Sequence, residues 1–174
     1  MLRIAVSMIL GGLALVAGSS VSTGDEPAVR DLVARRNAAY HNLDAETLAS
    51  LETPDFQIVD RFGDNIRSGG SDFNVRLWSW AFKYVYRGQP APEHIIIGAR
   101  FLTPDVAVVQ STNQWPSLTL DDGTVIPPHR EVDTFTVVRR DGVWKIALQT
   151  IHNNFGEGVG DNPTFDEHPR IPGK

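Results

Sequence analysis

Apolar residues recur along the first part of the chain with the period of helices and along the second part with the period of strands. The apolar positions between Val29 and Leu43 fall on one helical stripe, and Pro27 suits the first turn of that helix. Asp44 is placed to cap a second, short helix, which must end before Pro54. We therefore expect two helices, followed by a strand over 56–60.

A loop and a third helix separate this strand from the rest of the chain. Residues 61–70 hold three glycines together with Asp and Asn, which is typical of a turn or loop. Ser71 is expected to cap the third helix, which Gly88 and Pro90 end. After it, β-patterned runs separated by turn signals lie at 93–102, 106–115, 130–139 and 143–152. This order indicates an α+β protein, with the helices packed on one face of a curved antiparallel sheet.

The two ends of the chain differ in composition from the middle. Residues 1–22 contain Arg3, an apolar run and then small residues, the pattern of a secretory signal peptide that is cleaved or kept as an N-terminal anchor. The Gly/Pro-rich residues 156–174 predict a flexible tail. Residues 27–155 suffice for one domain. We expect a secreted or periplasmic protein with no stable membrane span after signal cleavage.

Composition excludes several classes of function. The chain has 16 Lys and Arg against 21 Asp and Glu, and its basic residues do not cluster as nucleic-acid binding requires. It has no cysteine, which excludes disulfides and thiolate chemistry. The residues His94, His129 and His152 show no metal-ligand spacing, and no glycine-rich phosphate loop stands between a strand and a helix. We expect no metal, no cofactor and no nucleic-acid partner.

Two aspartates stand in otherwise apolar, β-patterned runs. Asp60 closes the run 56–60, and Asp133 lies within 132–138. Because burying an unpaired carboxyl group is costly, both are candidates for a functional site. Each also has a structural alternative: Asp60 can cap the turn that follows it, and Asp133 can pair with Arg36 or Arg130.

The order helix, helix, strand, loop, helix, four strands resembles the nuclear transport factor 2-like (NTF2-like) superfamily, which includes ketosteroid isomerase and the SnoaL-like polyketide cyclases. The resemblance spans roughly 27–155, and its sharpest part is Asn42-Leu43-Asp44, then Asp60, then Gly63 and Arg67-Ser68-Gly69. It implies a cone-shaped NTF2-like fold, with three N-terminal helices packed on a strongly curved antiparallel (mixed) sheet. It also implies a homodimer.

The same resemblance assigns roles to individual residues. Asp60 matches the base of the isomerase, and Asp133 matches the protonated aspartic acid that donates a hydrogen bond to the substrate oxygen. The position of the oxyanion-binding tyrosine falls on Arg36, with Tyr40 one helical turn away. A cation at Arg36 would favour the ionised form of Asp133 and make it an ion-pair partner instead.

We expect these groups to meet in one interior cavity. Its catalytic residues would be Asp60, Asp133 and His152, the last on the strand face of Ile146 and Leu148 unless it is a satisfied polar residue at the sheet end. Its walls would be Arg36, Tyr40, Trp78, Phe82, Trp115 and Asn153.

The sequence thus predicts an exported, SnoaL-like pocket protein for a small, partly apolar organic molecule. With an aspartate base, such a pocket could catalyse proton transfer in an isomerase, dehydratase or cyclase reaction. The alternatives are a non-catalytic ligand-binding protein and a dimeric interaction module of the same fold.

Overall fold

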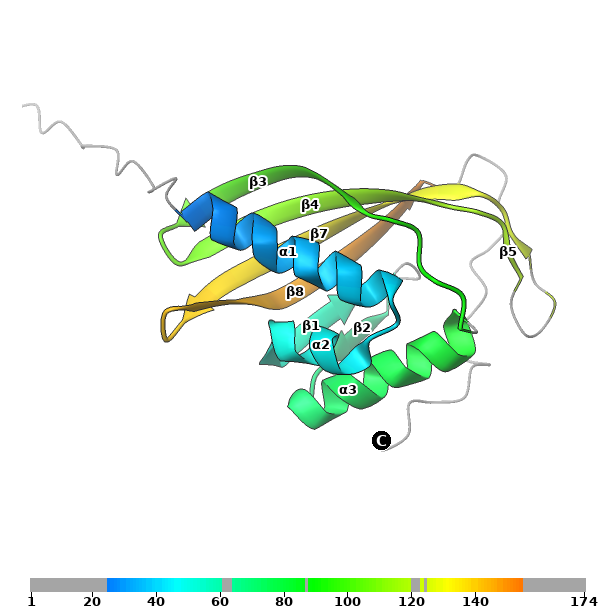
Figure 1. Cartoon of the computed structure of the whole chain (residues 1–174), viewed down its shortest axis with the longest axis horizontal. Coiled ribbons are helices and arrows are strands. Elements are labelled where there is room, and N and C mark those ends of the chain that lie inside the picture. Colours follow the sequence, from blue (N-terminus) through cyan, green and yellow to red (C-terminus); the bar gives the residue numbers. More distant parts are fainter. Residues whose placement is uncertain (1–24, 61–63, 87, 120–122, 124, 155–174) are drawn as a thin grey trace, which may run out of the picture.

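The computed structural model describes residues 25–60, 64–86, 88–119, 123 and 125–154 (Figure 1). The expected signal peptide (1–22) and tail (156–174) lie outside these residues. The helices are α1 (Glu26–His41), α2 (Ala45–Leu51) and α3 (Ser71–Trp80), the last continuing as a π-helical turn over Ala81–Val85. The strands are β1 (Glu52–Val59), β2 (Asn65–Arg67), β3 (Ile95–Thr103), β4 (Val106–Trp115), β5 (Leu118–Thr119), β6 (Val125–Ile126), β7 (His129–Arg140) and β8 (Val143–Asn154).

Six strands form one mixed sheet in the order β2-β1-β8-β7-β4-β3, and β5 and β6 form a separate short hairpin. Only the β1–β8 pair of the six-stranded sheet is parallel. The helices lie on one face of the sheet: α1 crosses β3, β4 and β8, whereas α2 and α3 cover β1 (Figure 1). The expected α+β architecture is confirmed. No helix within the described residues has both the length and the apolar character to cross a bilayer.

The first elements follow the sequence prediction, with two corrections. Asp44 caps α2 by accepting a hydrogen bond from the Thr47 amide at 2.9 Å. Part of the expected loop is a strand, because 65–67 pair with the end of β1. The cap of α3 is Gly70 and Ser71 is the first helical residue, since the cap position has φ 114°, which glycine adopts without strain.

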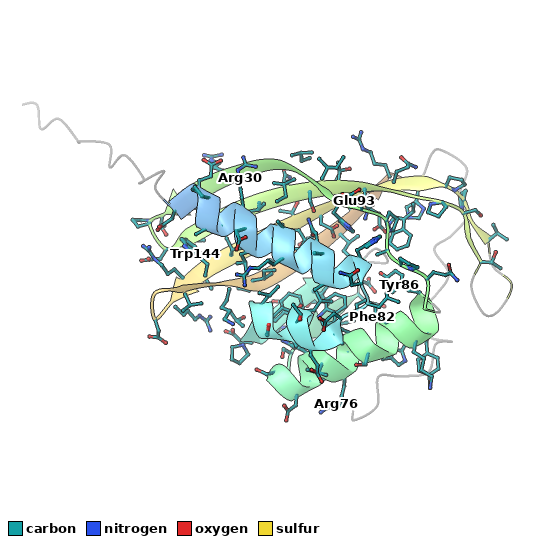
Figure 2. The ribbon with its side chains drawn as sticks, viewed as in Figure 1. Arg30, Arg76, Phe82, Tyr86, Glu93 and Trp144 are labelled. Carbon is teal, nitrogen blue, oxygen red and sulfur yellow. The ribbon has the colours of Figure 1, made fainter. Side chains whose placement is uncertain are left out.

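The core lies between the helices and the sheet and is rich in aromatic side chains. Phe82 in the π-helical turn after α3, and Tyr86 directly after that turn, point into this space (Figure 2). Phe135 on β7 and Phe56 on β1 close it from the sheet side. The interior of the fold therefore has a largely aromatic wall.

A β-bulge in β8 changes which side chains face this interior. Thr136 pairs with Leu148 but Val137 pairs with Ile146, so Ala147 is an extra residue in β8. Before the bulge Ile146 is buried, and after it the buried positions are Gln149 and Ile151. The even-numbered residues after Ala147 consequently face outward.

Candidate functional site

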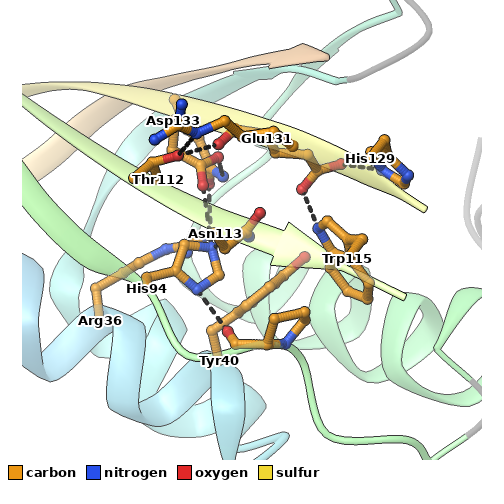
Figure 3. A network of polar contacts seen from close by, with 12 residues as sticks. Arg36, Tyr40, His94, Thr112, Asn113, Trp115, His129, Glu131 and Asp133 are labelled. Carbon is orange, nitrogen blue, oxygen red and sulfur yellow. Dashed lines mark hydrogen bonds and ion pairs between the residues drawn. The ribbon is translucent and has the colours of Figure 1, made fainter. Parts of the chain in front are cut away.

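Asp133 is the centre of a buried polar network that joins α1, β7, β8 and the segment before β3 (Figure 3). Its Oδ1 accepts a hydrogen bond from Gln149 Nε2 at 2.9 Å, and its Oδ2 lies 3.1 Å from His94 Nε2. Gln149 Oε1 in turn accepts from Arg36 Nη2 at 2.7 Å. We call His94, Asp133, Gln149 and Arg36 the interior network.

The surroundings of Asp133 keep its carboxyl group ionised. Burial by itself raises the pKa of Asp133, but the hydrogen bond to His94, the charges of Arg36 and His94 and the hydrogen bond from Gln149 outweigh it. The pKa therefore lies below the ordinary value of an aspartic acid. This favours the ion-pair alternative over the protonated donor implied by the resemblance, with His94 as the direct partner and Arg36 reached through Gln149.

His94 contacts polar groups through both of its ring nitrogens. Its Nδ1 lies 2.9 Å from the carbonyl oxygen of Pro92, so this nitrogen carries hydrogen. Its Nε2 lies 3.1 Å from Asp133 Oδ2 and 2.7 Å from the Asn113 amide nitrogen. The geometry thus indicates a buried His94–Asp133 pair, with the His94 side chain 1% exposed.

Sequence reasoning considered His94 only as a metal ligand. The described part of the chain has no group of three or more His, Cys, Asp or Glu side chains arranged as metal ligands. The signal that could have drawn attention to His94 is a histidine just before an apolar strand, at a place where its ring packs inward.

Asp60 lies in a different setting. It is partly exposed, its Oδ1 accepts a hydrogen bond from the Asp64 amide at 2.9 Å, and its own amide donates to the Asp64 carbonyl at 2.9 Å. These bonds join the residue after β1 to the residue before β2, which fits the structural alternative raised for Asp60. The described contacts of Asp60 and Asp133 involve different residues.

Arg36 is buried where an uncompensated charge would be costly. It is 1% exposed, its guanidinium lies 4.3 Å from the Tyr40 ring centroid and 4.9 Å from that of Phe135, and these faces attract the cation. Among the described residues its Nη1 has no hydrogen-bond partner. Arg36 thus retains one unused donor in the interior.

Glu52 is a second buried carboxyl group, which sequence reasoning missed. It is the first residue of β1, and its Oε1 accepts a hydrogen bond from Trp78 Nε1 at 2.7 Å. Burial raises the pKa of Glu52 to about 8, although the Trp78 hydrogen bond and the charge of Arg36 act in the opposite direction. Glu52 is therefore largely protonated at neutral pH, unlike Asp133.

The expected wall residues Tyr40, Trp78, Phe82 and Trp115 are all buried. The Tyr40 hydroxyl shares a hydrogen bond with that of Tyr86, and the Tyr40 ring meets His94 edge-on at 5.5 Å. This contact places aromatic surface beside the interior network.

A further buried acid, Glu131, lies beside Trp115. Glu131 on β7 accepts a hydrogen bond from Trp115 Nε1, and its Oε1 lies 3.4 Å from His129 Nε2. Tyr86 stacks on Trp115 at 5.4 Å and connects this group to Tyr40. Sequence reasoning did not single out Glu131.

A pocket of about 590 Å³ opens between α1 and the segment that enters β3. On one side α1 contributes Ala34, Asn37, Ala38 and His41, and on the other lie Glu93, His94 and Ile96. We call this the α1–β3 pocket. His94 belongs both to its wall and to the interior network, so the pocket reaches the partner of Asp133.

The expectation that His152 faces the interior is wrong. The residue is exposed, because the bulge at Ala147 turns Thr150 and His152 to the outer face of the sheet, opposite Gln149 and Ile151. Asn153 pairs with Glu131 in the β7–β8 ladder, and its side chain lies outside the description.

No family model matches the sequence, and no curated protein matches it. Solved structures do resemble the fold. An uncharacterized protein with a cystatin-like fold from Caulobacter vibrioides has a TM-score of 0.66 and 20% identity, over 80% of this chain and 96% of that one. A ketosteroid isomerase-like protein from Erwinia carotovora atroseptica has a TM-score of 0.64 and 14% identity, over 78% and 100%.

A third structure is an NTF2-like protein with a cystatin-like fold from Novosphingobium aromaticivorans, with a TM-score of 0.57 and 17% identity over 78% of this chain and 85% of that one. At these identities the likeness concerns the backbone arrangement. The chain therefore has the cystatin-like fold that is shared by NTF2-like and ketosteroid isomerase-like proteins.

Proposed function

We propose that the protein binds a small, partly apolar organic molecule in the α1–β3 pocket, with the His94–Asp133 pair at its inner wall. The position of His94 carries this proposal, because this residue lines the pocket and its ring contacts Asp133. A cluster of buried charges beside an open pocket is a frequent feature of binding and catalytic sites.

The lining of the pocket fits a ligand of this kind. Ala34, Ala38 and Ile96 offer apolar surface, whereas Asn37 and His41 offer polar groups. Small-molecule sites combine mainly apolar walls with a few polar groups that orient the ligand.

A tryptophan at position 38 should block ligand binding. Ala38 is an exposed residue of α1 that lines the pocket, so an indole there would occupy the space without disturbing the core. Ala28→Trp is the matched control, since Ala28 is exposed on the same helix and does not line the pocket. The purified proteins would be incubated with a mixture of hydrophobic metabolites, and the bound compounds identified by mass spectrometry.

We expect wild type and Ala28→Trp to retain the same compounds and Ala38→Trp to retain about a tenth or less, a loss of roughly 1.4 kcal/mol or more in binding free energy. If Ala38→Trp retains as much as wild type, the α1–β3 pocket is not the binding site.

Proton-transfer catalysis of the isomerase, dehydratase or cyclase type is the second candidate. The ring of His94, held by the ionised Asp133 beside the pocket, would be the group that exchanges a proton with the ligand. Recovered compounds with altered mass or chromatographic retention, absent with His94→Gln, would support catalysis. Unaltered compounds would support binding alone. This candidate uses His94 and Asp133 and does not require Asp60, whose Oδ1 accepts the Asp64 amide hydrogen bond.

We further propose that two copies pair through the sheet face that the helices leave uncovered. The edge strand β3 exposes Ile95 and Ile97 on this face, at 66% and 55%. We expect a dimer in sedimentation velocity for wild type and a folded monomer for Ile97→Lys. Tyr84→Lys, which changes an exposed aromatic residue on the helical side, should remain dimeric. A monomeric wild type would contradict this proposal.

We also propose that the protein is exported, on the basis of the pattern of residues 1–22. In the producing organism, its mature form should be found outside the cytoplasm with residues 1–22 removed. A full-length form confined to the cytoplasm would contradict this.

A further inference from the structure

Among the described residues, one polar side chain of the α1–β3 pocket has no hydrogen-bond partner. Asn37 on α1 is only 6% exposed, and within the described residues neither its Nδ2 nor its Oδ1 has a hydrogen-bond partner. A buried polar group without a partner costs about 1–3 kcal/mol. The pocket therefore contains a donor and an acceptor side by side that no side chain in the described part of the chain satisfies.

The residues around Asn37 indicate which kind of ligand group could bind beside it. His41, one turn further along α1, has its Nδ1 2.6 Å from the Ala91 carbonyl oxygen, so Nδ1–H donates there and does not face the ligand. Glu93 adds a carboxylate on the opposite side of the pocket. The negative charge of Glu93 disfavours an anionic ligand group.

We propose that Asn37 recognises a neutral carboxamide or lactam group of the ligand. Such a group presents a carbonyl acceptor and an N–H donor next to each other, so it pairs with the Asn37 amide through two hydrogen bonds. A carboxylate presents acceptors only, leaves Asn37 Oδ1 without a donor and lies near Glu93. This inference rests on the proposed function for the place of the binding site.

The test compares two probes of the same shape, benzamide and benzoate, titrated into the full protein at pH 7 and followed by NMR chemical shifts. We expect benzamide to bind roughly tenfold or more tightly than benzoate, which corresponds to about 1.4 kcal/mol. Asn37→Leu should weaken benzamide binding by a similar factor. The control Arg35→Gln changes an exposed residue of the same helix outside the pocket and should leave it unchanged.

Thermal unfolding separates recognition from a structural role. Replacing a buried amide that lacks partners by leucine should leave the melting temperature of Asn37→Leu unchanged or raise it. If leucine does not fit, Asn37→Ala serves the same comparison. A lower melting temperature in both variants, together with unchanged benzamide affinity, would assign Asn37 a structural role and overturn the inference.

Equal binding of benzamide and benzoate, or binding of neither, would also overturn it. These results are distinct from a failure of the proposed function, which would appear as undiminished metabolite binding by Ala38→Trp. If Ala38→Trp loses its metabolites while benzamide shows no preference, the pocket is the binding site and only the carboxamide inference fails.

Discussion

Glu52→Gln should make the protein more stable than wild type at pH 8 and leave its stability nearly unchanged at pH 4. Burial raises the pKa of Glu52 from 4.5 to about 8. The folded state therefore holds a proton that the unfolded state releases between these pH values. A carboxamide resembles the protonated acid, accepts the same Trp78 hydrogen bond and does not ionise.

The direction and size of this difference in stability follow from proton linkage. Because the folded state binds more protons than the unfolded state, the contribution of Glu52 is fully present below pH 4.5 and is lost as the pH rises towards 8. The loss is about 1.4 kcal/mol per pH unit, or roughly 4–5 kcal/mol across the whole window. Few single substitutions on the surface have effects of this size.

Urea unfolding of both proteins between pH 4 and pH 9 measures this difference. Glu46→Gln is the matched control, because Glu46 is an exposed glutamate of α2. The difference in unfolding free energy between Glu46→Gln and wild type should stay small and nearly constant with pH. A constant difference for Glu52→Gln would show that Glu52 ionises in the folded protein as it does in water.

Asp133→Asn should destabilise the protein by about 3–5 kcal/mol at pH 7, the usual cost of removing one partner from a buried ion pair. The substitution removes the negative charge that faces His94 and, through Gln149, Arg36. The buried Arg36 guanidinium would then remain in the interior without a counter-charge, and His94 would lose its carboxylate partner.

The pH dependence of this variant should be opposite to that of Glu52→Gln. The pKa of Asp133 lies below its ordinary value of 3.8, so its contribution is present above that value and is lost as the pH falls through the folded-state pKa. The difference in unfolding free energy between wild type and Asp133→Asn should therefore shrink below pH 4.

Asp55→Asn is the control for a surface pair. Asp55 and Arg140 form an ion pair at 3.0 Å with side chains 66% and 52% exposed. Removing this ion pair should lower the free energy of unfolding by less than about 1 kcal/mol. If Asp133→Asn lowers the free energy of unfolding no more than Asp55→Asn does, then Asp133 does not stabilise the buried charge of Arg36.

The elements that the sequence predicted well are those decided by local pattern. The cap at Asp44 and the strand 106–115 follow from short-range chemistry and alternation, and both occur as expected. The side-chain directions in β8 could not be predicted in the same way. The bulge at Ala147 is a property of strand pairing, and it moved His152 from the expected inner face to the outer one.

The contacts of the interior network could not be predicted from local sequence pattern either. The β-patterned run around Asp133 marked it as a candidate, but its partners His94 and Gln149 lie on other elements and come together only in the folded chain. Glu52 gave no signal in the sequence, since its raised pKa arises from burial against Trp78 and Arg36. A residue pattern can suggest a buried carboxyl group but does not reveal which groups surround it.

A crystal structure of the protein with a metabolite captured from the mixture tests the central claim most directly. We predict that the compound lies in the α1–β3 pocket, in contact with Asn37 and His94. A compound bound elsewhere, with this pocket holding only solvent, would contradict the proposed function.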